Sequence, residues 1–310
     1  MTLQSVQPKR VIATGEGRMK IDAQGHEIYY RIFGSGKKTL LGLHGGPGIG
    51  HSYLERLSEV VDDDVRLVLY DQLGGGKSDR PTDDSLWQVP RFVEELETVR
   101  SNLGLGTVHL LGQSWGGMLA LQYALDYPHN VRSLILSNTM ASAKEYLIAV
   151  SKHRIGLGTD MHALMLKREH QNDLSAADYQ DALLELNSRH LRRSSPYEPK
   201  RSRDEFQKIA AEYLADLGPA YALWGPHEFL GTGPEADFDV TDRLHEIRVP
   251  ALILCGYYDE VSPDCSRTLA NGLVDNEFVI FGNSSHLTIL EKEANVYLAV
   301  IRDFLQRHLE

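Results

Sequence analysis

Short apolar segments of strand length alternate with helical segments in the first half of this chain, and this alternation limits the fold more than any other feature. Thr107–Leu111 and Val131–Leu136 have the length and composition of buried strands, and Trp115–Tyr127 between them is predicted to be a helix. Before them, apolar residues recur with the spacing of one helix face, at Phe92, Val93, Leu96, Val99 and Leu103. Strand–helix–strand units place their strands in a parallel sheet with helices on both faces. The chain is therefore predicted to have an α/β fold.

The same pattern predicts most of the remaining sheet. Arg18–Asp22 and His26–Phe33 flank Gln24-Gly25 and are predicted to form a hairpin. Further strands are expected at Thr39–His44, Arg66–Tyr70, Pro250–Gly256 and Phe278–Phe281, and a last helix at Ala294–Leu305.

Residues 141–239 contain no convincing strand and are predicted to be helical, with segments at Asp160–Lys167, Ala176–Arg189 and Arg203–Leu217. The simplest interpretation is a core with a mostly parallel central sheet, made of residues 1–140 and 240–310. A helical cap of residues 141–239 is then inserted after the sixth strand. An insertion at the carboxyl edge of a parallel sheet is well placed to cover a ligand site, because ligands bind at that edge.

Composition and charge exclude several other classes of protein. Of the 310 residues, 42% are hydrophobic and 24% charged, which is typical of a globular protein and not of a disordered one. No apolar run approaches the roughly 18 residues of a membrane helix, and the N-terminus lacks the features of a secretory signal. The net charge of −11 argues against a nucleic-acid partner, and two cysteines are too few for a disulfide framework or a cysteine metal site. We therefore expect a cytoplasmic protein without membrane or nucleic-acid partners, while no stretch of the chain indicates its oligomeric state.

The most informative motif is Gly112-Gln113-Ser114-Trp115-Gly116, a G-x-S-x-G sequence that follows a predicted strand and begins a predicted helix. In this context the motif forms a nucleophile elbow, a tight turn that exposes the serine hydroxyl at the end of the sheet. Small residues two positions before and after the serine allow the backbone to make that turn. Ser114 is therefore predicted to be a catalytic nucleophile.

A serine hydroxyl needs a neighbouring base, and in this architecture the chain order is nucleophile, acid, histidine. Asp259 follows the predicted strand Pro250–Gly256, and His286 follows Phe278–Phe281, so both are expected at the same edge of the sheet as Ser114. We expect His286 to act as general base and then as general acid, while Asp259 orients its ring and stabilises the imidazolium.

Three other residues compete for the acid and histidine positions. Asp264 and Asp275 also lie in the last part of the chain, but Asp264 is predicted to begin a helix and Asp275 precedes the next strand. His308 also follows Asp259, but it falls in the tail of the last helix.

A glycine-rich loop, His44-Gly45-Gly46-Pro47-Gly48, directly follows the third predicted strand. Such a loop can direct a backbone N–H, here that of Gly46, toward a developing oxyanion, with the N–H of Trp115 as the second donor. The alternative is a plain strand-to-helix turn. The loop lacks the G-x-x-x-x-G-K-[ST] spacing of a phosphate loop, and the sequence predicts neither a cofactor nor a metal.

Six motifs together resemble the proline iminopeptidase family of serine α/β-hydrolases, over nearly the whole chain. They are HGGPG at 44–48, YDQLGGGKSDRP at 70–81, GQSWGG at 112–117, GPHEF at 225–229, GYYDEVSP at 256–263 and SSHLTILE at 284–291. The resemblance implies an α/β-hydrolase fold and an aminopeptidase that releases N-terminal proline. GPHEF and YDEV are also similar to the archaeal tricorn-interacting aminopeptidase, a relative with a broader residue preference.

In these relatives, two glutamates at the matching motif positions hold the free amino group of the substrate. The resemblance assigns this role to Glu228 in GPHEF and Glu260 in YDEV. Paired carboxylates offset the hydration that a protonated amine loses in a closed pocket. The chain departs from the family pattern at Gly75, where the family usually has Cys, and at His227, where it usually has Asn.

The sequence therefore predicts a metal-independent serine aminopeptidase that acts on short peptides with N-terminal proline through an acyl-enzyme intermediate. An amidase or esterase of small amino-acid amides or esters remains an open alternative, because those substrates present the same amine and carbonyl. A non-catalytic binding protein on the same fold is a more distant alternative, since fold does not fix function. The presence of both Ser114 and His286 argues against it.

Overall fold

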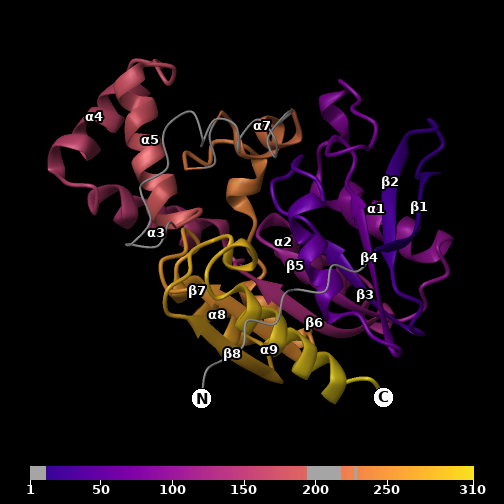
Figure 1. Ribbon diagram of the computed structural model, residues 1–310. Coiled ribbons are helices and arrows are strands. Elements are labelled where there is room, and N and C mark those ends of the chain that lie inside the picture. Colours follow the sequence, from indigo (N-terminus) through magenta and orange to yellow (C-terminus); the bar gives the residue numbers. More distant parts are fainter. Residues whose placement is uncertain (1–11, 194–217, 227–228) are drawn as a thin grey trace.

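An eight-stranded sheet organises the molecule (Figure 1) in a computed structural model that describes residues 12–193, 218–226 and 229–310. The strands are β1 (Ala13–Lys20), β2 (Glu27–Phe33), β3 (Lys38–Leu43), β4 (Val65–Asp71), β5 (Val108–Gln113), β6 (Val131–Ser137), β7 (Ala251–Gly256) and β8 (Asn276–Phe281). Their order across the sheet is β1-β2-β4-β3-β5-β6-β7-β8. All pairs from β4 to β8 are parallel, whereas β2 pairs antiparallel with β1 and β4. The predicted α/β architecture with a mostly parallel sheet is confirmed.

The described helices include those predicted from the sequence, together with two between residues 141 and 239 that were not predicted. They are α1 (Val89–Asn102), α2 (Trp115–Asp126), α3 (Ala143–Ile155), α4 (Thr159–His170), α5 (Ala177–His190), α7 (Gly218–Trp224), α8 (Pro263–Gly272) and α9 (Ala294–Arg307), with a 3-10 helix, η1 (Ser52–Val60), after β3. The sequence pattern did not single out α3, because Ile148 and Ile155 are exposed while Arg154 is buried, which blurs its apolar face. The helix predicted at Arg203–Leu217 lies outside the described residues.

The first strand differs from the prediction. The hairpin pattern places it at Arg18–Asp22, whereas β1 begins earlier and ends at Lys20. The strand stops there because Asp22 belongs to the turn: its Oδ1 accepts the N–H groups of Gly25 at 2.9 Å and His26 at 3.0 Å. Such local bonds between a side chain and the backbone compete with strand pairing.

Alternate residues of the parallel strands pack into separate cores on opposite faces of the sheet. In β3, Leu41 and Leu43 join the core that contains α1 and α2, whereas Leu40 joins the core formed by η1 and α9. Successive side chains of a strand point to opposite faces, so covering both faces buries nearly the whole strand.

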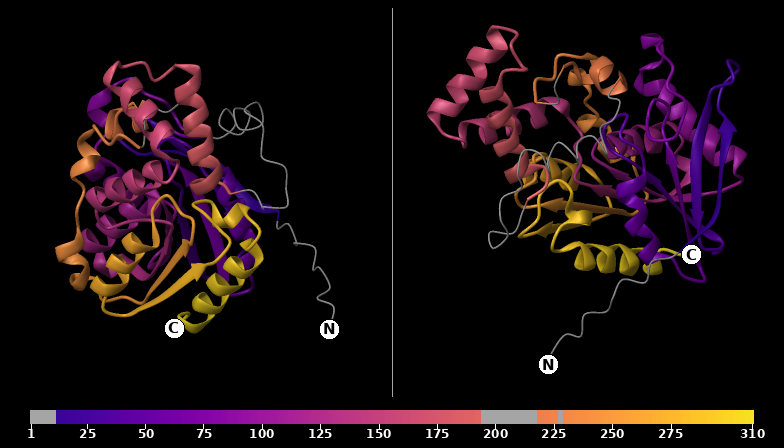
Figure 2. Two further views of the ribbon diagram at one scale, coloured as in Figure 1. Left: turned by 90° about the vertical axis from the view of Figure 1, so that its left-hand side faces the viewer. Right: turned by 45° about the horizontal axis from the view of Figure 1, so that its top comes forward.

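Helices α3, α4, α5 and α7 lie together beyond one end of the sheet (Figure 1), and both views in Figure 2 show the same grouping. This is the carboxyl end of the parallel strands, because α3 follows directly from the end of β6. These four helices, the helical group, therefore lie over the edge of the sheet at which the predicted site residues stand.

Within the described ranges, no helix is long and apolar enough to cross a membrane.

Candidate active site

Ser114 stands at the sharp turn between β5 and α2. Its backbone has φ 55° and ψ −125°, a conformation that non-glycine residues rarely adopt. Two glycines allow the close contacts of this turn: a Cβ on Gly112 would lie 2.1 Å from the oxygen of Gly116, and one on Gly116 would lie 2.4 Å from the oxygen of Leu43. The turn therefore fixes the serine at the carboxyl end of β5, in the geometry of a nucleophile elbow.

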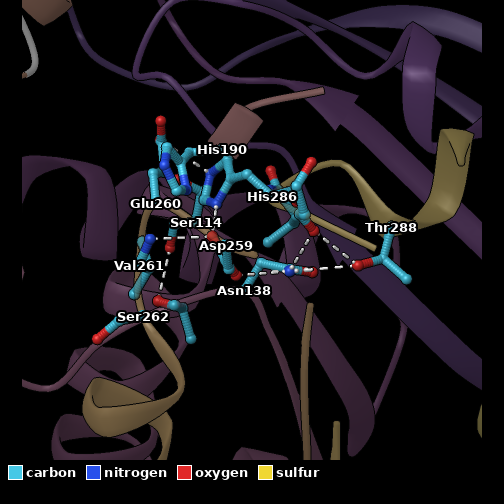
Figure 3. A network of polar contacts seen from close by, with 12 residues as sticks. Ser114, Asn138, His190, Asp259, Glu260, Val261, Ser262, His286 and Thr288 are labelled. Atoms are coloured by element: carbon cyan, nitrogen blue, oxygen red, sulfur yellow. Dashed lines mark hydrogen bonds and ion pairs between the residues drawn. The ribbon is translucent and has the colours of Figure 1, made fainter. Parts of the chain in front are cut away.

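Asp259 and His286 meet beside this turn, and Figure 3 draws them together with Ser114. The Nδ1 atom of His286 lies 2.7 Å from Oδ1 of Asp259, and the two side chains are 4% and 0% exposed. Because a carboxylate only accepts hydrogen bonds, Nδ1 carries the proton and Nε2 is left as the basic nitrogen. This is the tautomer that a general base next to a serine requires.

Asp259 is itself held by a residue that the sequence analysis missed, Asn138. The side-chain Nδ2 of Asn138 donates to Oδ2 of Asp259 at 2.7 Å, while the N–H of Val261 donates to Oδ1 at 2.9 Å. Asn138 adopts φ 51°, and its own Oδ1 accepts the hydroxyl of Ser137 at 2.8 Å. A polar residue directly after β6, the strand beside β5, was the signal that could have identified it.

The two predicted oxyanion donors lie next to Ser114. Gly46 follows β3 with φ 113°, a conformation that suits glycine. Trp115 is the first residue of α2, so its N–H is one of those that a helix leaves without an intrahelical acceptor. Both residues line the same pocket as Ser114. Backbone N–H groups placed beside a nucleophile are suited to stabilise an oxyanion.

Gln72, which the sequence analysis did not single out, connects the segments that carry these donors. Its Nε2 donates to the oxygen of His44 at 3.0 Å, and its Oε1 accepts from the indole Nε1 of Trp115 at 2.7 Å. Its backbone N–H donates to Nε2 of His44 at 3.0 Å, which requires that nitrogen to be unprotonated. Burial lowers the pKa of His44 below its ordinary value of 6.5, in agreement with a neutral ring.

A small pocket with both polar and apolar lining lies over Ser114. It is lined by Gly46, Ser114, Trp115, Met118, Met140, Tyr146, Trp224, Glu260 and Val261. Glu260 is the single acid in this lining, and it is 4% exposed. Its Oε1 lies 3.5 Å from Nε2 of His286. Two consecutive acids therefore face the two nitrogens of one imidazole, with Asp259 at Nδ1 and Glu260 at Nε2.

The second predicted amine-binding acid, Glu228, and its neighbour His227 lie outside the described residues. The other departure from the family pattern, Gly75, packs against the loop that carries Gly46. A Cβ on Gly75 would lie 3.1 Å from the carbonyl carbon of Gly48, so a larger residue there would require this loop to shift slightly.

The competing acids and histidine lie away from the pocket. The side chain of Asp264 is 70% exposed and pairs with Arg267, and Asp275 is exposed in the turn before β8. His308 lines a separate hollow with Thr107, which lies at the opposite, amino end of β5. In the described part of the chain, no three His, Cys, Asp or Glu side chains are grouped to hold a metal ion.

Comparison with known proteins agrees with this fold. The family model of the alpha/beta hydrolase fold matches residues 38–293, so the chain belongs to the α/β-hydrolases. The proline iminopeptidase of Clostridium botulinum is 36% identical over 287 residues, which cover 91% of this chain and 96% of that protein. The crystal structure of Mycobacterium smegmatis proline iminopeptidase has a TM-score of 0.83 and 29% identity, with 94% of this chain and 99% of that chain covered. The crystal structure of VinJ has a TM-score of 0.86 and 31% identity, with 96% of this chain and 100% of that chain covered.

Within the α/β-hydrolases, the chain belongs to the proline iminopeptidase family. The family resemblance carried by the six sequence motifs is therefore confirmed.

Proposed function

We propose that this protein is a serine aminopeptidase that releases an N-terminal residue, preferably proline, from short peptides. The observation that carries this proposal is Glu260, a buried carboxylate that lines the pocket of Ser114. A general esterase has no need of a negative charge at that point, whereas a protonated α-amine is bound well by one. The preference for proline rests on the relatives that are named proline iminopeptidases.

In the acylation step, Nε2 of His286 takes the proton of the Ser114 hydroxyl as Oγ attacks the carbonyl carbon of the first residue. The N–H groups of Gly46 and Trp115 stabilise the oxyanion that forms, and Asp259 stabilises the imidazolium. His286 then gives its proton to the leaving nitrogen as the C–N bond breaks. The shortened peptide leaves, and the first residue remains as an ester of Ser114.

In the deacylation step, water replaces the leaving peptide in the pocket. His286 takes a proton from the water, whose oxygen attacks the ester carbon, and then returns the proton to Oγ as the C–O bond breaks. The free amino acid is released and the serine hydroxyl is restored.

Glu260, together with the second predicted acid Glu228, holds the α-ammonium group and so measures the distance to the scissile carbonyl. Because that distance is fixed, only the first residue of a peptide can present its carbonyl to Ser114. Tyr146 of α3 and Trp224 at the end of α7, whose ring centroids are 5.7 Å apart, supply apolar surface for the proline ring. In this proposal α3 and α7 belong to a cap of residues 141–239, inserted between the core segments 1–140 and 240–310.

We propose that the enzyme acts in the cytoplasm. Cys255 and Cys265 are both buried and free, which supports a reducing compartment.

The test compares kcat/KM for a prolyl arylamide, its N-acetylated counterpart and an alanyl arylamide. We expect the free amine to be preferred by at least about 100-fold, because a site built around a polar group discriminates strongly against a substrate that lacks it. The ratio of prolyl to alanyl turnover then separates a proline-specific enzyme from a broader amidase. Equal turnover of the free and acetylated substrates would contradict the amine-binding role and leave a general serine esterase or amidase.

A further inference from the structure

Two histidines from the helical group stack on each other and contact the loop that carries Asp259 and Glu260. His153 of α3 and His190, the last residue of α5, are stacked with ring centroids 3.9 Å apart and an interplanar angle of 27°. The Nδ1 atom of His190 lies 2.9 Å from the oxygen of Tyr258, and Nε2 of His153 lies 3.1 Å from the oxygen of Asp259. Since a carbonyl only accepts hydrogen bonds, each of these nitrogens carries a proton, and the two rings are opposite tautomers.

The main chain of the same segment contacts both loops of the acid–base pair. The carbonyl oxygen of His190 accepts the N–H of Glu260 at 3.2 Å and the N–H of His286 at 3.0 Å. One residue further on, the oxygen of Leu191 accepts the N–H of Leu287 at 3.0 Å. Figure 3 shows His190 beside Glu260 and His286. The end of α5 therefore lies between the loop after β7 and the loop after β8 and is bonded to each.

Both rings are suited to act as neutral donors. Burial is the main cause that lowers the pKa of His190 to about 4, and burial also lowers the pKa of His153. Neutral rings can stack face to face without charge repulsion, and each keeps the single N–H that its carbonyl needs.

We propose that His153 and His190 are positioning residues for the acid–base half of the active site. By holding the carbonyls of Tyr258 and Asp259, they fix the backbone so that the carboxylate of Asp259 meets His286 and that of Glu260 reaches the pocket. This inference rests on the proposed function only in that it takes Asp259 and His286 as the working acid and base. It does not depend on the identity of the substrate.

Because the two rings donate from different nitrogens, the same pair of substitutions, Asn and Gln, should have opposite effects at the two positions. Each position therefore serves as the control for the other. The side-chain amide nitrogen of Asn can take the place of Nδ1 of histidine, and that of Gln can take the place of Nε2. We expect His190→Asn and His153→Gln to keep kcat/KM for a prolyl arylamide within about threefold of wild type. His190→Gln and His153→Asn should lose about tenfold or more, mostly in kcat, because small misplacements of catalytic groups are costly.

A role in positioning also predicts a change that loss of stability alone does not cause. A carboxylate beside an imidazole favours the imidazolium, so loosening Asp259 from His286 should move the acidic limb of the kcat/KM profile to lower pH in the two mismatched variants. The matched variants should keep the wild-type limb. Equal kcat/KM for Asn and Gln at both positions would overturn the proposal. Lower thermal stability with an unmoved acidic limb and unchanged kcat would overturn it as well.

A second readout separates this inference from the aminopeptidase assignment. The rate at which a fluorophosphonate probe labels Ser114 reports the reactivity of the serine and requires no amine on the substrate. If the wild-type protein is labelled but cleaves neither prolyl nor alanyl arylamide, the proposed function fails while the labelling rates still decide the positioning role. We expect these rates to fall about tenfold in His190→Gln and His153→Asn only, and equal rates across all four variants would refute the role.

Discussion

The two halves of the candidate active site differ in how much support they take from the helical group. The nucleophile half consists of Ser114, Gly46 and Trp115, and its polar contacts come from the sheet and the loops of the core, as with Gln72. The acid–base half consists of Asp259, Glu260 and His286. Asn138 of the core holds Asp259, and the end of α5 is bonded to this half as well, through His190. The comparison predicts that the core alone can present a reactive serine, whereas the proposed base and the proposed amine-binding acid depend on the helical group as well as on the core.

The largest effect is expected in the nucleophile half, from Ser114→Ala. Removing the nucleophile should lower kcat for a prolyl arylamide by a factor on the order of 10⁴ or more, as losses of triad members do. The strained backbone of residue 114 is held by the surrounding glycine contacts, so the thermal midpoint should stay close to that of wild type. Hydrolysis at the wild-type level in this variant would remove the assignment of Ser114.

The next largest effect is expected in the acid–base half, from Glu260→Gln. Loss of a charge-assisted contact to the substrate ammonium should lower kcat/KM for the prolyl arylamide by roughly 10- to 100-fold. A neutral ester without an amine serves as control, and its turnover should change less than about threefold, because it makes no such contact. Equal losses on both substrates would mean that Glu260 acts on His286 and not on the amine.

These residues also show how far local sequence could predict the site. Ser114, Asp259 and His286 lie one, three and five residues after the ends of β5, β7 and β8, so a strand pattern and the chain order were enough to bring them to one edge of the sheet. The fold followed for the same reason, since strand–helix alternation is a local signal. The first strand was misplaced at its end because the turn at Asp22 depends on a side-chain bond that alternation does not encode.

The supporting residues could not be predicted, because their roles depend on contacts that are distant in the chain. Asn138 and Asp259 are 121 residues apart, and His190 and Tyr258 are 68 residues apart. Their meeting depends on which strands are neighbours and on how the helical group packs on the core. Gln72 lay within a recognised family motif, but its partners became clear only when the loops were placed side by side.

A smaller effect should separate support in the core from support by the helices, through Gln72→Leu. This change leaves the indole N–H of Trp115 and the oxygen of His44 without their partner and loosens the proposed oxyanion hole. We expect kcat to fall about tenfold with little change in KM, because the oxyanion exists only during reaction. The acidic limb of the pH profile should not move, in contrast to the limb expected for His190→Gln. A shifted limb in the Gln72 variant would show that the two halves are not supported separately.

The smallest effect concerns stability and compares two buried glutamates. Glu95 of α1 accepts the N–H of Leu73 at 3.1 Å and pairs with Arg91. Glu235 lies between α7 and β7 in the chain. Neither of its carboxylate oxygens has a hydrogen-bond partner among the described residues. Burial raises the pKa of Glu235 from 4.5 to about 8. Between these values the folded chain keeps a proton that the unfolded chain releases, so stability falls as the pH rises through this window.

Glu235→Gln should remove that pH dependence, since glutamine stays neutral throughout. Its thermal midpoint should match wild type near pH 4, where Glu235 is protonated in both the folded and the unfolded chain, and should exceed it by about 2–4 °C near pH 8.5, where the buried charge has formed. Glu95→Gln is the matched comparison. Burial also raises the pKa of Glu95, to about 7, but Arg91 and the N–H of Leu73 offset part of the cost of its charge, so the gain in midpoint near pH 8.5 should be smaller than for Glu235→Gln. Activity of the Glu235 variant should equal that of wild type, because neither half of the active site contacts this residue in the proposed mechanism. If Glu95→Gln raises the midpoint near pH 8.5 as much as Glu235→Gln, or more, the partners of Glu95 do not offset the cost of its buried charge, and the contrast between the two regions does not extend to their stability.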